Sequence, residues 1–75
     1  MRPDQDMRRR FAANLCDRRE RAGLTREALG RMCGLHRTAI GLLERCERSP
    51  RLETIVVLAD ALGLDSPGEL LDGIR

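Results

Sequence analysis

Apolar residues recur at helical spacing along most of the chain, which predicts an all-α fold. The first helix is predicted to begin after Asp4 or Asp6, either of which can cap it, and to run to Ala22, with Gly23 as its stop. Its inward stripe is expected to consist of Met7, Phe11, Leu15 and Ala22. A long first helix with one apolar face therefore opens the predicted fold.

Two short helices joined by a glycine turn follow. Thr25 is a good N-cap for a helix that runs to about Cys33, a tight turn is expected at Gly34–Leu35, and a second helix covers about 36–45. Gly34 needs a positive φ at this turn, and Gly30 must be small for the two helices to approach. The residues expected to fill the space between them are Leu29, Leu35, Ile40 and Leu43.

The last third of the chain predicts two more helices. Pro50 prevents the preceding helix from continuing, and a helix over about 52–62 ends at Gly63. Its inward stripe is expected to be Ile55, Leu58, Ala59 and Leu62. Ser66, Pro67 and Glu69 form a capping signal for a terminal helix over about 67–74. With no internal repeat and no long linker, residues 1–75 are expected to form one five-helix domain.

Composition excludes several classes of protein. Phe11 is the only aromatic residue, so the chain offers no stacking platform for single-stranded nucleic acid. No apolar run could span a bilayer or act as a signal peptide, so we expect a cytoplasmic protein without membrane contacts. One His and no paired nucleophile predict no enzyme. Nothing indicates a cofactor or a small-molecule ligand.

The three cysteines suggest no metal site or disulfide framework, because none form a C-x-x-C pair. Cys33 and His36 have C-x-x-H spacing, but a metal site needs more ligands, and Cys33 suits a small core residue better. A redox role for Cys16 or Cys46 stays open.

Positive charge is concentrated in the front of the chain. Residues 1–51 hold 13 of the 14 arginines and 7 acidic residues, whereas residues 52–75 hold one arginine and 5 acidic residues. A protein that faces phosphates on one side would show this asymmetry. Solvated charged helix faces would show it equally, so charge alone leaves both interpretations open.

The chain resembles the lambda-repressor-like (Cro/Xre-type) helix-turn-helix family over roughly residues 11–71. The matching pieces are Arg19, G-L-T-R-E-A-L-G, G-L-H-R-T-A-I, L-L-E-R and S-P-R-L-E-T-I-V-V-L-A-D-A-L-G-L. The helix-turn-helix itself spans about 25–45. The resemblance implies a sequence-specific regulator of transcription that binds double-stranded DNA, usually as a homodimer on a pseudo-palindromic operator.

The resemblance also assigns roles to residues. It implies base contacts by Arg37, Thr38 and Leu42, the last expected to be exposed. Residues expected to contact the DNA backbone are Arg26, His36, Arg45, Arg48 and Arg51. Arg19 and Glu44 are expected to form an ion pair that ties the first helix to the third.

The sequence departs from the family pattern in several places. His36 replaces a usual Ser or Thr cap, and Arg51 replaces a small cap. Cys46 replaces a frequent glycine, which predicts strain or an altered loop path. Arg18 takes a usually apolar position, where its stem can be buried.

Apolar residues near the C-terminal end predict a dimer interface as the alternative to finishing the monomer's core. The candidates are Val57, Leu70, Leu71 and Ile74. Within the regulator interpretation, the short H-R-T-A-I run resembles small controllers of restriction–modification operons, while antitoxin and phage-repressor roles stay open. The competing class is a protein-interaction module whose helix-turn-helix no longer binds DNA.

Overall fold

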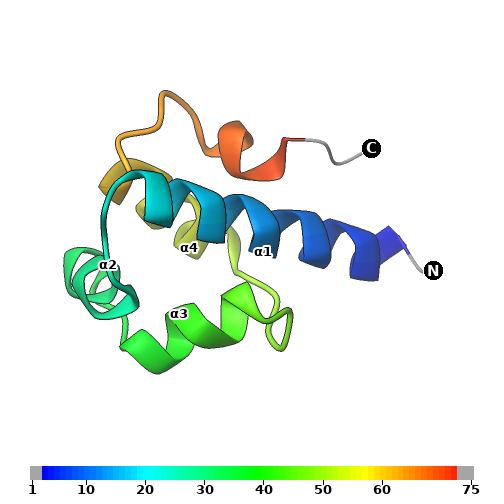
Figure 1. Ribbon diagram of the computed structural model, residues 1–75. Coiled ribbons are helices and arrows are strands. Elements are labelled where there is room, and N and C mark those ends of the chain that lie inside the picture. Colours follow the sequence, from blue (N-terminus) through cyan, green and yellow to red (C-terminus); the bar gives the residue numbers. More distant parts are fainter. Residues whose placement is uncertain (1–2, 73–75) are drawn as a thin grey trace.

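Four α-helices and a terminal 3₁₀ helix make up residues 3–72, the part of the chain that this computed structural model describes (Figure 1). The elements are α1 (Pro3–Arg21), α2 (Arg26–Cys33), α3 (Arg37–Glu44), α4 (Leu52–Ala61) and the 3₁₀ helix η1 (Pro67–Leu71). The all-α prediction is confirmed, and the last element differs from the predicted α-helix.

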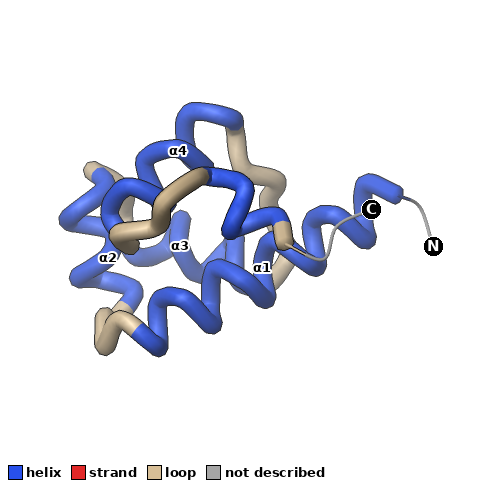
Figure 2. Tube along the Cα trace, turned by 90° about the horizontal axis from the view of Figure 1, so that it is seen from above, coloured by secondary structure: helices blue, strands red, loops and turns tan. Residues whose placement is uncertain are grey.

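α1 runs through the middle of the fold, with α3 on one side of it and η1 on the other (Figure 1). Phe11, Ala12 and Leu15 on this helix are buried in the core. Met7 is about half exposed (47%) rather than buried as predicted, because the first turns of α1 extend beyond the other helices (Figure 2). Ala22 is also exposed, since α1 ends at Arg21 and the chain turns away there.

The turn between α2 and α3 forms as predicted. Thr25 caps α2, its Oγ1 accepting a hydrogen bond of 3.0 Å from the amide of Ala28. Gly34 has φ 72°, the left-handed conformation that glycine adopts without steric cost. Gly30 lies so close to the Leu35 carbonyl that an added Cβ would collide with it. Both glycines are therefore required for the close approach of α2 and α3.

One apolar core joins all five elements. Its fully buried large side chains come from α1, α2, α3, α4 and η1: Phe11, Leu15, Leu29, Ile40, Leu58 and Leu70. Ile55 and Ala59 of α4 and Leu43 of α3 complete the buried cluster, and Leu35 and Leu62 pack against it while partly exposed. The predicted core stripes of the three later α-helices are thus confirmed.

The terminal element is a five-residue 3₁₀ helix, so the prediction of an α-helix over 67–74 is wrong for the described residues. The predicted capping box of Ser66 and Glu69 is present. Asn14 of α1 donates hydrogen bonds to the carbonyls of Leu70 (3.0 Å) and Asp72 (2.9 Å). This amide satisfies carbonyls that a longer helix would have used internally, and the backbone becomes extended at Asp72.

Candidate nucleic-acid interface

The start of α3 carries the side chains expected to read bases. His36 is its N-cap, with Nδ1 accepting a 3.0 Å hydrogen bond from the amide of Thr38. The imidazole therefore acts as a cap in place of Ser or Thr. The Thr38 hydroxyl lies 2.9 Å from the same nitrogen, which leaves the Thr38 methyl group available for apolar contacts.

α3 exposes one side of its first turn and buries the other. Arg37 and Thr38 are exposed, whereas Ile40, Gly41 and Leu43 are buried. Leu42 is half-buried rather than exposed as expected, so part of its side chain belongs to the packing of the monomer. The structure thus places Arg37 and Thr38 together on the outer surface, with Leu42 contributing a smaller area.

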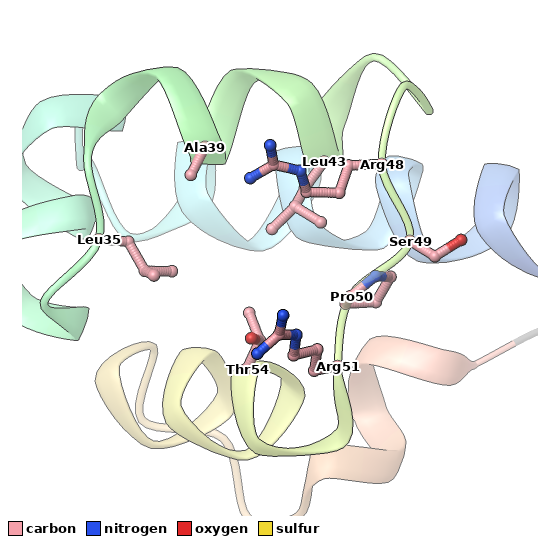
Figure 3. Close-up of a pocket in the computed structure, with 8 residues that line it drawn as sticks. All are labelled: Leu35, Ala39, Leu43, Arg48, Ser49, Pro50, Arg51 and Thr54. Atoms are coloured by element: carbon pink, nitrogen blue, oxygen red, sulfur yellow. The ribbon is translucent and has the colours of Figure 1, made fainter.

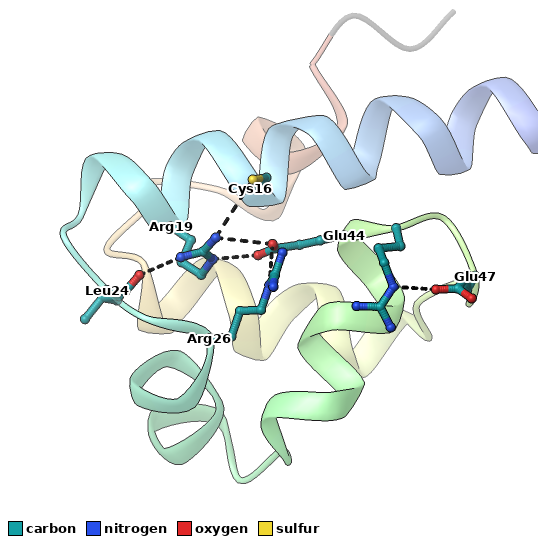
Figure 4. Close-up of polar contacts among 7 residues, drawn as sticks. Cys16, Arg19, Leu24, Arg26, Glu44 and Glu47 are labelled. Atoms are coloured by element: carbon teal, nitrogen blue, oxygen red, sulfur yellow. Dashed lines mark hydrogen bonds and ion pairs between the residues drawn. The ribbon is translucent and has the colours of Figure 1, made fainter.

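A buried carboxylate anchors the end of α3. The predicted Arg19–Glu44 ion pair is confirmed: Arg19 Nε donates to Glu44 Oε2 at 2.6 Å and Nη2 donates to Oε1 at 3.3 Å (Figure 4). Arg19 Nη1 also donates to the Leu24 carbonyl at 2.8 Å. Only 2% of the Glu44 side chain is exposed, so α1, the loop after it and α3 are joined through one largely buried site.

Arg26 is the second partner of Glu44, a contact that sequence analysis missed. Its Nε donates to Glu44 Oε1 at 3.0 Å from the first residue of α2, and nearly half of its side chain is exposed (Figure 4). Burial alone raises the pKa of Glu44, but the hydrogen bonds and positive charges of Arg19 and Arg26 outweigh it and hold that pKa below its usual value. Glu44 therefore stays ionised and fixes a guanidinium at the start of α2.

Two further arginines extend into a hollow between α3 and the start of α4. The hollow has a volume of about 550 Å³, and the guanidinium groups of Arg48 and Arg51 point into it (Figure 3). Ala39, Leu43 and Thr54 line its walls. Arg51 occupies the N-cap position of α4 but its side chain does not cap the helix, because a guanidinium has only donors and cannot accept hydrogen bonds from the helix amides.

Two exposed arginines pair with exposed carboxylates. Arg45 Nε lies 2.5 Å from Glu47 Oε2, and Arg37 Nη1 lies 3.5 Å from Glu27 Oε2.

Between Arg45 and Glu47, Cys46 has φ 62°, the only positive φ of a non-glycine residue in the described part of the chain. The predicted strain at Cys46 is confirmed, because a side chain here occupies a conformation that favours glycine.

Arg18 and the expected dimer residues have different surroundings. Arg18 Nη2 forms an ion pair of 3.4 Å with Glu69, which ties α1 to η1.

Leu70 is fully buried inside the monomer, so it has no surface to offer a partner, and its place among the interface candidates was wrong. Val57 and Leu71 are exposed, and Ile74 lies outside the described residues.

Neither a metal centre nor a membrane span is found in residues 3–72. No group of three or more His, Cys, Asp or Glu side chains within this range could hold a metal ion. Cys33 is partly buried against α4, with its thiol donating to the Val57 carbonyl at 3.9 Å, and burial raises its pKa. None of the helices in this range has the length and apolar character needed to cross a bilayer.

Comparisons with known proteins agree with this geometry. A family model described as a helix-turn-helix domain matches residues 10–72. The chain is 40% identical over 62 residues to the control protein C.SmaI of Serratia marcescens, covering 83% of this chain and 74% of that protein.

Two solved structures superpose closely. A hypothetical transcription factor, NHTF, from Neisseria has a TM-score of 0.84 and 37% identity, over 89% of this chain and 76% of that one. The P22 c2 repressor, solved in complex with a synthetic operator, has a TM-score of 0.76 and 35% identity, over 84% of this chain and 94% of that one. These relatives are regulators and repressors rather than enzymes, as expected for this chain. The chain therefore belongs to the helix-turn-helix domain family and has the lambda-repressor-like form that its motifs indicated.

Proposed function

We propose that this protein is a regulator of transcription that binds specific sites in double-stranded DNA through α3. The observation that carries the proposal is the exposed first turn of α3, with Arg37 and Thr38 on its surface, together with guanidinium groups on the neighbouring elements. Arg26 lies at the start of α2, and Arg48 and Arg51 lie between α3 and α4. The P22 c2 repressor, which was solved with operator DNA, has the same fold.

The side chains at the start of α3 suit the major groove. An α-helix fits its width of about 12 Å, and an arginine fork pairs with O6 and N7 of guanine. We assign this role to Arg37. The Thr38 methyl group suits the methyl of thymine, and the exposed part of Leu42 can add an apolar contact one turn further on.

The flanking cations suit the DNA backbone. Arg26 is fixed by Glu44 through Nε, which leaves its Nη atoms for a phosphate. Arg48 and Arg51 can hold another phosphate from the hollow that they share. Arg45 and His36 complete the proposed backbone contacts. Such contacts position the protein on the duplex, whereas the α3 side chains select the sequence.

The experiment that tests this function measures binding to duplex DNA. Affinity for a random duplex should fall steeply between 50 and 200 mM salt, roughly a thousandfold or more if six or more phosphates are contacted. Selection from a random duplex pool should then enrich a defined site. Duplex binding that is absent, or that does not weaken with salt, would instead favour a protein-interaction module.

We further propose that the protein acts as a homodimer. One recognition helix contacts only a few base pairs, so two copies related by a two-fold axis would read a pseudo-palindrome with half-sites about 34–36 Å apart. The candidate surface is apolar and is made by residues of α4 and η1. Leu52, Val56 and Leu71 are exposed, and Leu71 lines a hollow of about 220 Å³ together with Met7 and Ile55 among others.

Among the biological roles, a controller of a restriction–modification operon has the most support. The 40% identity to control protein C.SmaI favours it over an antitoxin or a phage-type repressor. A regulator that acts on DNA works in the compartment that holds the DNA, and we propose the cytoplasm as that compartment.

A further inference from the structure

The start of α2 carries an acidic side chain on the surface proposed to meet DNA. Glu27 is the second residue of α2, and its Oε2 lies 3.5 Å from Nη1 of Arg37, the first residue of α3. The pair therefore joins the starts of the two helices. Both side chains are more than half exposed, 65% for Arg37 and 59% for Glu27. Because an exposed pair of this kind is weak, Arg37 can exchange Glu27 for another acceptor.

The two acceptors that DNA offers to Arg37 differ in charge. A phosphate carries a negative charge, so the Glu27 carboxylate beside Arg37 repels it. The edge of a guanine is neutral and offers O6 and N7 in the geometry that fits a guanidinium fork. Glu27 therefore disfavours a phosphate as the partner of Arg37 far more than it disfavours a guanine.

We propose that Glu27 determines sequence specificity by holding Arg37 away from phosphates until a guanine replaces the carboxylate. This inference rests on the proposed function, in which Arg37 reads a base. On a non-specific duplex, Arg37 stays paired with Glu27 and adds no backbone contact. On the selected site, the two hydrogen bonds to guanine replace the ion pair. Glu27 is thus a positioning residue whose removal should strengthen non-specific binding and leave specific binding nearly unchanged.

The test compares wild type with Glu27→Gln on a random duplex and on the site selected by wild type. Freed from the carboxylate, Arg37 should contact a phosphate on random DNA and tighten that binding about threefold. The slope of log affinity against log salt on random DNA should steepen by about 0.9, the value of one added phosphate contact. Affinity for the selected site should change little, so the specificity ratio should fall about threefold.

Asp60→Asn is the matched control. Asp60 is an exposed acid near the end of α4, so this variant removes the same charge at a distance from Arg37. If Glu27→Gln tightens random binding no more than Asp60→Asn does, the proposal is wrong. Circular dichroism melting of each variant verifies that it is folded.

A double variant separates action through Arg37 from simple charge repulsion. In an Arg37→Ala background, Glu27→Gln should have no more effect on random DNA than Asp60→Asn has. An undiminished effect in that background would overturn the proposed role, because Glu27 would then act on the phosphates directly. If wild type shows no salt-dependent binding to duplex DNA, the proposed function itself is wrong. This outcome differs from the two above, in which wild type binds DNA but Glu27 does not act through Arg37.

Discussion

At the scale of single residues, Glu44 is the side chain on which the proposed DNA-facing arrangement depends most. It accepts hydrogen bonds from both Arg19 and Arg26 and is almost fully buried. Its replacement by alanine leaves Arg19 with an uncompensated charge, so we expect a loss of up to about 3–5 kcal/mol in the free energy of unfolding. Urea denaturation measures this loss. Glu53→Ala, which removes an exposed carboxylate from α4, should change stability by less than about 0.5 kcal/mol. Equal effects of the two variants would contradict the anchoring role.

The same residue predicts how stability depends on pH. The pKa of Glu44 is lowered in the folded protein, so folding favours its ionised form. This contribution is fully present above the unfolded pKa of about 4.3 and is lost as pH falls through the lower folded value. Melting temperatures measured from pH 7 down to pH 3 should therefore fall less steeply for Glu44→Gln than for wild type. Parallel curves for the two proteins would show that Glu44 contributes nothing to acid sensitivity.

Arg37 is the residue on which base reading is predicted to depend. Arg37→Ala should cost about 1–3 kcal/mol on the selected site and relax the preference at one base pair, because a bidentate contact to guanine is lost. Fluorescence anisotropy with the selected duplex and its single-base variants measures both effects. A variant that binds the selected duplex as tightly as wild type would show that another residue reads that base.

Cys46 offers a gain in stability. Its φ of 62° costs an ordinary residue about 1–2 kcal/mol, and glycine removes that cost. The greater backbone freedom of glycine stabilises the unfolded state by about 0.5–1 kcal/mol, which offsets part of the gain. Cys46→Gly should therefore raise the free energy of unfolding by about 0.5–1 kcal/mol. Cys46→Ala keeps a Cβ in the strained conformation and serves as the control. If alanine stabilises as much as glycine, the thiol rather than the backbone is the source of the effect.

The residue-scale contacts also show what a sequence can predict of the site. The Arg19–Glu44 pair was predictable because its two members stand at positions that the family resemblance marks. The Arg26–Glu44 bond was not, since it depends on how closely the start of α2 lies to the end of α3. The Arg37–Glu27 pair likewise arises from the packing of two helices, ten residues apart in the chain. Such contacts follow from tertiary geometry, to which local periodicity gives no access.

At the scale of elements, the chain's local signals predicted both ends of α2, α3 and α4 to within about one residue. The predicted start of α1 was wrong, because this helix begins at Pro3 and includes Asp4 and Asp6, the two residues expected to cap it. Thr25 and Ser66 cap the elements for which they were proposed, because a cap depends on a few neighbouring residues. The predicted end of the terminal helix was wrong, because the end of η1 depends on hydrogen bonds from Asn14, more than fifty residues away in the chain. Likewise, Leu70 is buried because η1 packs between α1 and α4. The apolar residues next to Leu70 in the sequence did not indicate this packing.

The Asn14 contact predicts a local effect. Asn14→Asp keeps the shape of the side chain but removes both donors, and it brings a negative charge to the carbonyls of Leu70 and Asp72. We expect a loss of about 1–3 kcal/mol and faster hydrogen exchange at the amides of η1. Gln5→Glu makes the same chemical change on an exposed part of α1 and should leave η1 protected. Unchanged exchange in Asn14→Asp would mean that Leu70 burial alone holds η1 in place.

At the scale of the whole molecule, charge and apolar surface occupy different regions. The arginines proposed to contact DNA lie at the starts of α2 and α3, after the end of α3 and in the loop before α4, whereas α4 itself carries Leu52 and Val56 one turn apart on an exposed side. Leu52 is 77% exposed, a large apolar area for a chain of 75 residues to leave in water. We expect a dimer built on this surface to leave α3 of both copies free for DNA, because Leu52 and Val56 belong to α4.

Val56→Glu tests that arrangement directly. The charge would be buried at the two-fold interface, so the variant should sediment as a monomer at concentrations where wild type is dimeric. Its affinity for the pseudo-palindromic site should fall toward that of a single half-site. Met32→Glu is the matched control, because Met32 on α2 is 55% exposed and Val56 is 53% exposed. If Met32→Glu dissociates the dimer and Val56→Glu does not, the interface lies on α2 instead. Wild type that sediments as a monomer at high micromolar concentration, both free and bound to DNA, would remove the dimer, and specificity would then have to come from a single α3 helix.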